Sequence, residues 1–317
     1  MNTSPAGAMG EPVIERLALT FFDAEQLATA IREASIEHHQ LEAGDFRGEL
    51  RGLLAGPISL NSGRYSRMLR ARGWLPEGAV VLGAILDAER DGCINGYRFG
   101  ARDLVCYPAG AELDYLLPAG THWTALQLPG TVLGELGLSA SLFDRPRVFP
   151  ASFPGSARIV NRIARLAGAR SGTRVADWHA ELGALAAELM LVVHNDQGRG
   201  GRPSYAERMG LLRTFERLVR ERIDEDLRIP ALCAGIGVAQ RTLEQTFRDQ
   251  LGISPRRYLT ILRLHAARDA LLRGADVDIA SIAARCGMHH PGRFATEYRA
   301  LFGEPPSATG RTNGQRP

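Results

Sequence analysis

The spacing of apolar positions separates a β-rich half of the chain from a helical half. Between about Phe46 and Leu128, short apolar runs such as GAVVLGAIL alternate with turn signals rich in Gly and Pro. Runs of β-branched and aromatic residues bounded by such turns are typical of strands. This stretch therefore predicts a small all-β barrel or sandwich, and the helical spacing of DAEQLATAIREAS (23–35) predicts a helix that covers one of its edges.

From Pro154 to Asn195 the apolar residues recur at intervals of three and four, which is the helical period. Two amphipathic helices outside the β domain must bury their apolar stripes, either on that domain or on a second copy of the chain. The segment NDQGRGGRPS (195–204), rich in Gly and Arg, predicts a flexible linker after them. The residues of the two stripes are Ile159, Ile163 and Leu166, and Trp178, Leu182, Leu185 and Leu189.

After the linker the chain contains one pattern twice. Each copy has a short helix, a turn with Gly237 or Gly287, and a second helix whose apolar residues are four apart. The copies match at an offset of 50 before the turn and 51 after it, which indicates a repeated helix-turn-helix unit. The matched residues are Ile229, Leu232, Cys233, Ile236, Gly237, Val238, Leu243, Phe247, Leu251, Gly252 and Pro255 with Ile279, Ile282, Ala283, Cys286, Gly287, Met288, Phe294, Tyr298, Phe302, Gly303 and Pro306.

A cysteine and two histidines, Cys286, His289 and His290, lie within five residues of each other in the second unit. A metal site needs three or four converging ligands, and no acidic residue stands beside these three. Cys286 matches the apolar Ile236 in the repeat, so we expect it to face the core as a small hydrophobe. The histidines are then expected at the start of the second helix, where they either donate to DNA or are solvated or packed.

On the second helix of each unit, a rotation of about 100° per residue separates a buried face from an exposed face. Arg suits guanine, Gln suits adenine, and both reach phosphates. A polar face that only contacts solvent is the alternative for each residue. The candidate DNA-binding residues are Gln240, Arg241, Thr242, Gln245 and Arg248 in the first unit, and His289, His290, Arg293, Thr296 and Arg299 in the second.

The segment between the units, SPRRYLTILRLHAARDALLRG (254–274), predicts one long helix. Its roughly 17 residues would span about 25 Å at the usual rise. A strut of this length would hold the two second helices at a separation that approaches the roughly 34–36 Å between successive major grooves. One chain could therefore contact two consecutive grooves.

Charge favours a polyanionic partner for the C-terminal third. All 38 basic residues are arginine; residues 1–204 carry a net charge of −2, and residues 205–317 carry +5. The four cysteines have no C-x-x-C spacing, which argues against a zinc knuckle or a redox dithiol. No run of about 18 apolar residues and no secretory signal is present, so a cytoplasmic protein without membrane contact is expected.

The stretches IPALCAGIGVAQRTLEQTFRDQLGISPRRYL, LRLHAARDALL and IASIAARCGMHHPGRFATEYRALFGEPPS resemble the AraC/XylS family of bacterial transcription regulators, in the branch of aromatic-acid and ethanolamine catabolism regulators. The resemblance covers about residues 205–308. It implies a DNA-binding domain with two helix-turn-helix units that binds double-stranded DNA and regulates promoters, with RNA polymerase, a small-molecule effector and a second copy of the chain as partners. Pro291 and Gly292 depart from the family, because neither can read a base through its side chain.

The N-terminal half resembles the sensor domains of that family only in the order of its expected elements, a cupin-like β domain followed by a helical pair. A metal-dependent cupin enzyme needs a His-x-His with a further Glu and His, and His38, His39 and His122 lack that spacing. No cofactor, no metal and no catalytic residue are therefore expected. An effector pocket with an arginine for a carboxylate is conceivable, and core packing is the alternative for each candidate. The candidate residues are Tyr65, Trp74, Tyr97, Tyr107 and Trp123.

The sequence thus predicts an α+β multidomain protein. Its expected parts are a cupin-like sensor domain (1–153), a helical dimerisation segment (154–195), a linker (196–204), a DNA-binding domain (205–308) with helix-turn-helix units at about 229–251 and 279–302, and a flexible tail (309–317). The expected function is a sequence-specific activator that responds to an effector. The alternatives are a ligand-independent regulator controlled by a partner protein and a cupin enzyme fused to a DNA-binding domain.

Overall fold

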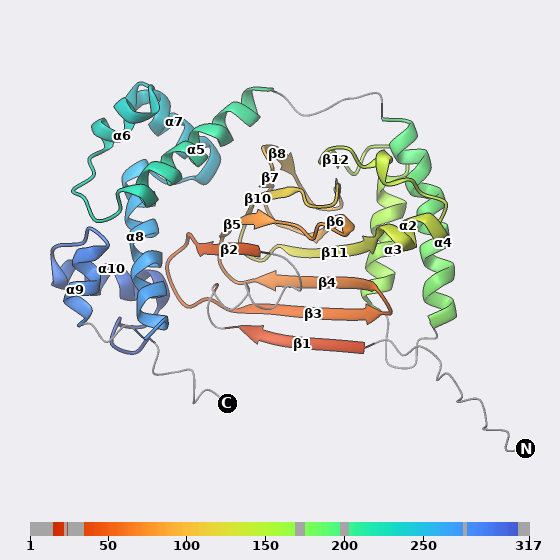
Figure 1. The fold of residues 1–317 in the computed structure, drawn as a ribbon, viewed down its shortest axis with the longest axis horizontal. Helices are drawn as coiled ribbons and strands as arrows, with labels where there is room; N and C mark the ends of the chain where they lie inside the picture. Colours follow the sequence, from red (N-terminus) through yellow and green to blue (C-terminus); the bar gives the residue numbers. More distant parts are fainter. Residues whose placement is uncertain are drawn as a thin grey trace, which may run out of the picture.

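The computed structural model describes residues 15–21, 24, 35–168, 175–196, 203–274 and 278–309. A β domain lies beside a helical domain, and two further helices cover the far side of the β domain (Figure 1). The predicted α+β class with a cupin-like sandwich is confirmed. The helix predicted over 23–35 falls almost entirely outside the described residues.

Two antiparallel sheets form the β domain. Their inner faces meet in a core that includes Phe46, Leu69 and Val105. The seven-stranded sheet has the order β1 (Glu15–Phe21), β3 (Gly48–Ala55), β4 (Ile58–Tyr65), β11 (His122–Pro129), β6 (Ala79–Asp87), β9 (Leu104–Tyr107) and β12 (Arg147–Phe149). The five-stranded sheet has the order β2 (Ser35–Gln40), β5 (Leu69–Trp74), β10 (Glu112–Leu117), β7 (Gly92–Ile94) and β8 (Tyr97–Phe99).

Helices α3 (Ser156–Ala167) and α4 (Val175–His194) cover the outer face of the seven-stranded sheet (Figure 1). Both predicted stripes are buried in one core with residues of that sheet, such as Leu82 and Leu126. The stripes are therefore used inside the protomer, and they are not available to a second copy. On the described part of α4, Met190 and Leu191 are the large apolar side chains that remain exposed. A short helix α2 (Gly130–Glu135) and a 3-10 turn (Ala140–Leu142) connect β11 to β12, the strand that precedes α3.

The C-terminal domain contains the two predicted helix-turn-helix units. The first unit is α6 (Ile229–Ile236) with α7 (Gln240–Leu251), and the second is α9 (Ile279–Arg285) with α10 (Pro291–Phe302). Helix α5 (Pro203–Glu221) packs against the first unit, and α8 (Pro255–Leu272) runs between the units as the predicted strut. Their shared core includes Phe215, Phe247, Tyr258 and Phe294.

The two turn glycines have the role that the repeat predicts. Gly237 and Gly287 follow the first helix of their units with φ of 79° and 72°, in the left-handed region that favours glycine. At Gly287 a Cβ would also lie 2.5 Å from the carbonyl oxygen of Ile223. Both the backbone conformation and the lack of space therefore disfavour a larger residue at this position. Within the described residues, no helix is long and apolar enough to cross a membrane.

Candidate DNA-binding face and ligand cavity

The first candidate recognition helix, α7, exposes the side chains that the sequence predicts. Leu243 and Phe247 are fully buried, whereas Arg241 and Arg248 are exposed. Gln240, Thr242 and Gln245 are also exposed, but two of them have partners within the helix. Gln240 donates to Glu244 at 2.8 Å, and Gln245 donates to Asp249 at 2.6 Å. Arg241 and Arg248 therefore present the guanidinium groups of this face.

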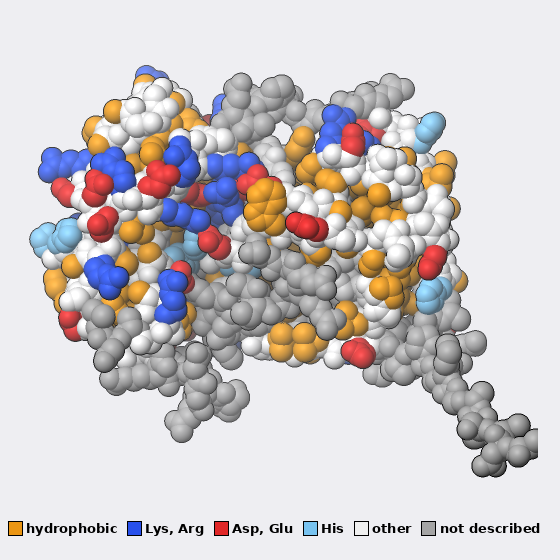
Figure 2. Space-filling view, viewed as in Figure 1, with side chains coloured by type: hydrophobic (Ala, Val, Ile, Leu, Met, Phe, Trp, Pro, Cys, Tyr) orange, Lys and Arg blue, Asp and Glu red, His pale blue; other side chains and the backbone are white. Residues whose placement is uncertain are grey.

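The second candidate helix, α10, begins at Pro291, where the missing N–H of proline costs no hydrogen bond. His289 and His290 are exposed immediately before it. Arg293, Thr296 and Arg299 are exposed along its outer side, and Arg293 forms an ion pair of 2.7 Å with Glu297 one turn later. Arginine side chains gather over the C-terminal helices in Figure 2, mixed with carboxylates, and histidines lie at the outer edge.

The starts of the two helices border one hollow of about 700 Å³. Gln240 and Glu244 of α7 line it from one unit, His290 and Arg293 line it from the other, and Arg256 of α8 lies between them. The starts of the two candidate helices thus border the same hollow, although Arg241, Gln245 and Arg248 are not in its wall. A reader of two grooves would need both helices to approach one face of the duplex.

The cluster of one cysteine and two histidines separates in the fold. Cys286 is buried in the core of the C-terminal domain, as its match with Ile236 predicts. Burial raises the pKa of its thiol, so the thiolate form is disfavoured. His289 and His290 are exposed and point away from that core. Among the residues that the structure describes, no group of His, Cys, Asp and Glu has the arrangement of a metal site.

A cavity of about 90 Å³ lies between the two sheets of the β domain. Its wall is mostly apolar, with polar atoms from a few side chains. The polar and aromatic residues in the wall are Asn61, Tyr107, Tyr115, Trp123, Thr124 and Gln127. The apolar residues are Ile36, Leu75, Val81, Ala84, Ile85, Ile94, Val105, Leu113, Leu117 and Ala125, together with Gly83.

The five predicted pocket residues have different positions. Tyr107 and Trp123 are in the cavity wall, and Tyr65 is buried beside it with its ring centroid 6.0 Å from that of Trp123. Trp74 is 59% exposed at the end of β5, and Tyr97 is half-buried on the edge strand β8, so neither is part of the described wall. Tyr115 is part of the cavity wall but is not among the predicted residues. The alternation of Leu113, Tyr115 and Leu117 along the chain is the pattern that indicates one shared strand face.

The hydroxyl of Tyr107 in the cavity wall lacks a hydrogen-bond partner among the described residues, whereas the indole N–H of Trp123 interacts with the hydroxyl of Tyr65. Burial raises the pKa of Tyr107 well above its ordinary value, so the hydroxyl keeps its proton and can donate. Tyr115, in contrast, shares a hydrogen bond of 2.9 Å with Nε2 of His38. The arginine expected for a carboxylate is not part of the described wall, and no other charged side chain is.

A match to a family model lies in the C-terminal domain, and several known proteins resemble part of the chain. Residues 232–312 match a family model described as a helix-turn-helix domain. A probable thc operon regulatory protein of Rhodococcus erythropolis is 36% identical over 105 residues, which is 32% of each chain. The HTH-type transcriptional regulator GbdR of Pseudomonas aeruginosa is 27% identical over 190 residues, 58% of this chain and 49% of the relative. The chain thus spans between a third and a half of the length of these relatives.

Solved structures also resemble part of the chain. A transcriptional regulator with an AraC-type DNA-binding domain from Chromobacterium violaceum is 28% identical, with a TM-score of 0.33. The match covers 35% of this chain and 99% of that chain. The residues matched by the family model include the helices that carry the two exposed faces.

Proposed function

Because the chain belongs to the AraC/XylS family of transcription regulators, we propose that it binds specific sites in double-stranded DNA and activates promoters in response to a small effector. The observation that carries this proposal is the pair of exposed helices α7 and α10, which border one hollow. Arg241, Gln245 and Arg248 would contact DNA from the first unit. The second unit would contribute His289, His290, Arg293, Thr296 and Arg299, with fewer base contacts because Pro291 and Gly292 carry no reading group.

The test is genome-wide mapping of the DNA fragments that the full chain retains at physiological salt. We expect discrete promoter sites with two short blocks about one helical turn apart, which is the spacing of successive major grooves. Uniform retention that falls steeply with salt would mean that the arginine-rich face binds phosphates without reading sequence. That result would refute the proposal of a specific regulator.

We propose that the effector binds in the cavity of the β domain and that it is small and uncharged. A cavity of about 150 Å³ accommodates benzene, so by the same ratio about 90 Å³ accommodates a ligand of roughly four non-hydrogen atoms. An ionised ligand would lose its hydration without gaining a charged partner from the described wall. The hydroxyl of Tyr107 would donate to an acceptor on the ligand.

Three compounds of the same shape, each with about four non-hydrogen atoms, test this ligand class: acetone, acetamide and acetate. Calorimetric titration of the full chain should give binding in the order acetone, then acetamide, with acetate at least about tenfold weaker than either because its charge is desolvated. Binding of acetate as tight as that of acetone would contradict the proposal of an uncharged ligand.

We also propose that the protein acts as a homodimer that recruits RNA polymerase. The family supports both partners. Met190 and Leu191 on α4 offer an exposed apolar contact for a second copy. Light scattering at micromolar concentration should give the mass of a dimer, and Leu191→Glu should shift it to that of a monomer. A monomer mass for the unmodified chain would contradict the dimer.

A further inference from the structure

The five-stranded sheet separates the cavity from the DNA-binding domain. On β10, Leu113, Tyr115 and Leu117 face the cavity, because successive side chains of a strand point to opposite faces. The alternate residues Glu112 and Asp114 face helix α5 of the DNA-binding domain, where they form ion pairs with Arg213. One strand therefore contacts both the candidate ligand site and the DNA-binding domain.

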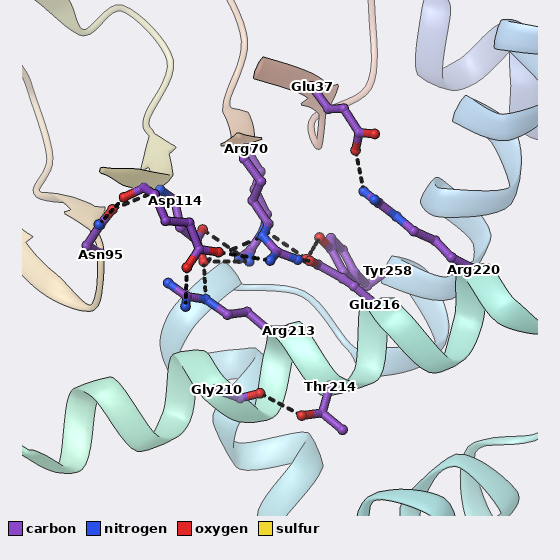
Figure 3. Close-up of polar contacts among 12 residues, drawn as sticks. Glu37, Arg70, Asn95, Asp114, Gly210, Arg213, Thr214, Glu216, Arg220 and Tyr258 are labelled. Atoms are coloured by element: carbon purple, nitrogen blue, oxygen red, sulfur yellow. Dashed lines mark hydrogen bonds and ion pairs between the residues drawn. The ribbon is translucent and has the colours of Figure 1, made fainter. Parts of the chain in front are cut away.

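Three arginines and three carboxylates form a network across this boundary. Figure 3 labels Arg70, Asp114, Arg213 and Glu216 of this network. Arg213 Nε on α5 lies 2.9 Å from Asp114 Oδ2 on β10. Glu216, one turn further along α5, has Oε1 2.9 Å from Arg70 Nε and receives a hydrogen bond from the hydroxyl of Tyr258 on α8. Arg72 and Glu112 complete the network at its more exposed side, with Arg72 Nη1 2.9 Å from Glu216 Oε2.

The network is buried, although its outer members contact solvent. The side chains of Arg70, Asp114 and Glu216 are at most 2% exposed, and that of Arg213 is 32% exposed. A charge in such a place must be paired, because an unpaired buried charge is strongly unfavourable. The network therefore has two acceptable arrangements: fully formed, with the sheet docked on α5, or opened to water, with the sheet withdrawn.

The same sheet also reaches the second helix-turn-helix unit. Gln40 Nε2 at the end of β2 donates to the carbonyl of Leu301 on α10 at 2.8 Å, and His265 Nε2 of α8 donates to the carbonyl of Gln40 at 3.0 Å. Gly44 N donates to the carbonyl of Ala300 at 2.9 Å. The docked β domain therefore holds α5 and α10 together, and with them the two candidate recognition helices.

We propose that the ion network on α5 is the contact through which occupancy of the cavity changes DNA binding, with Arg213 and Glu216 as positioning residues. The proposal rests on the proposed function, in which the cavity binds an effector and α7 and α10 bind DNA. A ligand that packs against Tyr115 moves β10, and β10 carries Asp114 on its other face. The ligand shifts the docking equilibrium only if it binds the docked and withdrawn states with different affinity.

The experiment uses Ala125→Leu as a substitute for a ligand, because Ala125 is in the cavity wall and leucine adds three carbon atoms there. This variant is combined with Arg213→Gln, and in a matched control with Arg217→Gln. Arg217 is on the same helix, is 61% exposed, and pairs with Glu221 of its own helix. The affinity of each full-length chain is measured for a duplex of about 30 base pairs, long enough for two successive grooves, which the unmodified chain has selected from a random library.

We expect Ala125→Leu to change the DNA affinity at least about fivefold, the lower end of ordinary allosteric coupling, in the unmodified and Arg217→Gln backgrounds. In the Arg213→Gln background we expect the change to fall below about twofold, since the relay is then broken. An equal change in all three backgrounds would overturn the proposal, as would the lack of any change in the unmodified background.

A second measurement needs neither a ligand nor the cavity variant. Hydrogen exchange of β10 amides in the full chain should be at least about tenfold faster in Arg213→Gln than in Arg217→Gln, because the docked sheet opens more often. Equal exchange in the two variants would overturn the role of the network. Failure of the unmodified chain to select any duplex would instead refute the proposed function, and the exchange comparison would still decide whether the network holds the sheet.

Discussion

Replacing Glu216 by glutamine should destabilise the protein strongly, because this carboxylate is the meeting point of two arginines and a tyrosine. The side chain is 2% exposed, with its oxygens 2.9 Å from Arg70 Nε and 2.9 Å from Arg72 Nη1. Removing one partner of a buried ion pair costs about 3–5 kcal/mol. Glutamine keeps an oxygen that can accept from Tyr258, so we expect about 3 kcal/mol, the lower end of that range.

The assay is urea unfolding of the full chain followed by circular dichroism, with Glu221→Gln as the control. Glu221 is on the same helix, its side chain is 52% exposed, and its partner Arg217 is exposed as well. We expect the control to lose less than about 0.5 kcal/mol, as exposed pairs usually do. A loss of under about 1 kcal/mol for Glu216→Gln would refute the reasoning that this buried charge is fully paired.

The difference between the two proteins should also depend on pH. Burial raises the pKa of Glu216, but Arg70, the hydroxyl of Tyr258 and Arg72 outweigh burial and hold the pKa below its ordinary value. A carboxyl with a lowered pKa in the folded state contributes its full stability above the unfolded pKa of about 4.3, and loses it as the pH falls toward the folded value. The advantage of the unmodified chain over Glu216→Gln should therefore shrink below about pH 4.

Three further predictions concern other parts of the molecule. Arg241→Ala should cost about 1–3 kcal/mol of DNA affinity and relax the choice at one base pair, whereas Arg248→Ala should weaken binding to all sequences and flatten the salt dependence; equal effects on specific and random duplexes would show that the reading face is misassigned. Gly237→Ala should lower the unfolding free energy by about 1 kcal/mol. Gly287→Ala should lower it by more, because only at Gly287 would the added Cβ meet a backbone oxygen. Equal losses of stability for the two variants in thermal melts would contradict this. Tyr107→Phe should leave the melting temperature unchanged or slightly raised, because its hydroxyl has no partner among the described residues, and it should weaken acetone binding in calorimetry; unchanged binding would remove Tyr107 from the ligand site.

The C-terminal domain could be predicted from the sequence in detail because its contacts are local. A helix closes its hydrogen bonds within four residues, so the period of Leu243 and Phe247 already determines which residues face outward. The internal repeat gave a second, independent view of each position, and it placed Cys286 in the core through its match with Ile236. The stripes on α3 and α4 were also visible, but which surface they cover required the sheet.

The fold class of the β domain could be predicted from the sequence, but the residues of its cavity wall could be predicted only in part. The wall of a cavity between two sheets depends on which strands pair and in which register, and a shift of one residue exchanges the two faces of a strand. The sequence alone therefore predicts Trp74 and Tyr97 as pocket residues together with Tyr107 and Trp123. Trp74 and Tyr97 lie outside the described cavity wall. The network around Glu216 joins this residue to Arg70 from the other half of the chain, and no local pattern links the two.

A domain exchange could be designed with a cut in the predicted linker (196–204), most of which lies outside the described residues. Such a cut would divide a packed unit, since Leu41, which follows β2, and Cys93 and Leu116 of the five-stranded sheet belong to the same apolar core as Leu212 and Phe215 of α5. A chimera joined in the linker would give α5 a foreign sheet surface, with neither matching side chains nor matching charges. The portable unit is the sheet together with the helices it contacts, so a working hybrid should exchange the outer face of β5 and β10 along with α5.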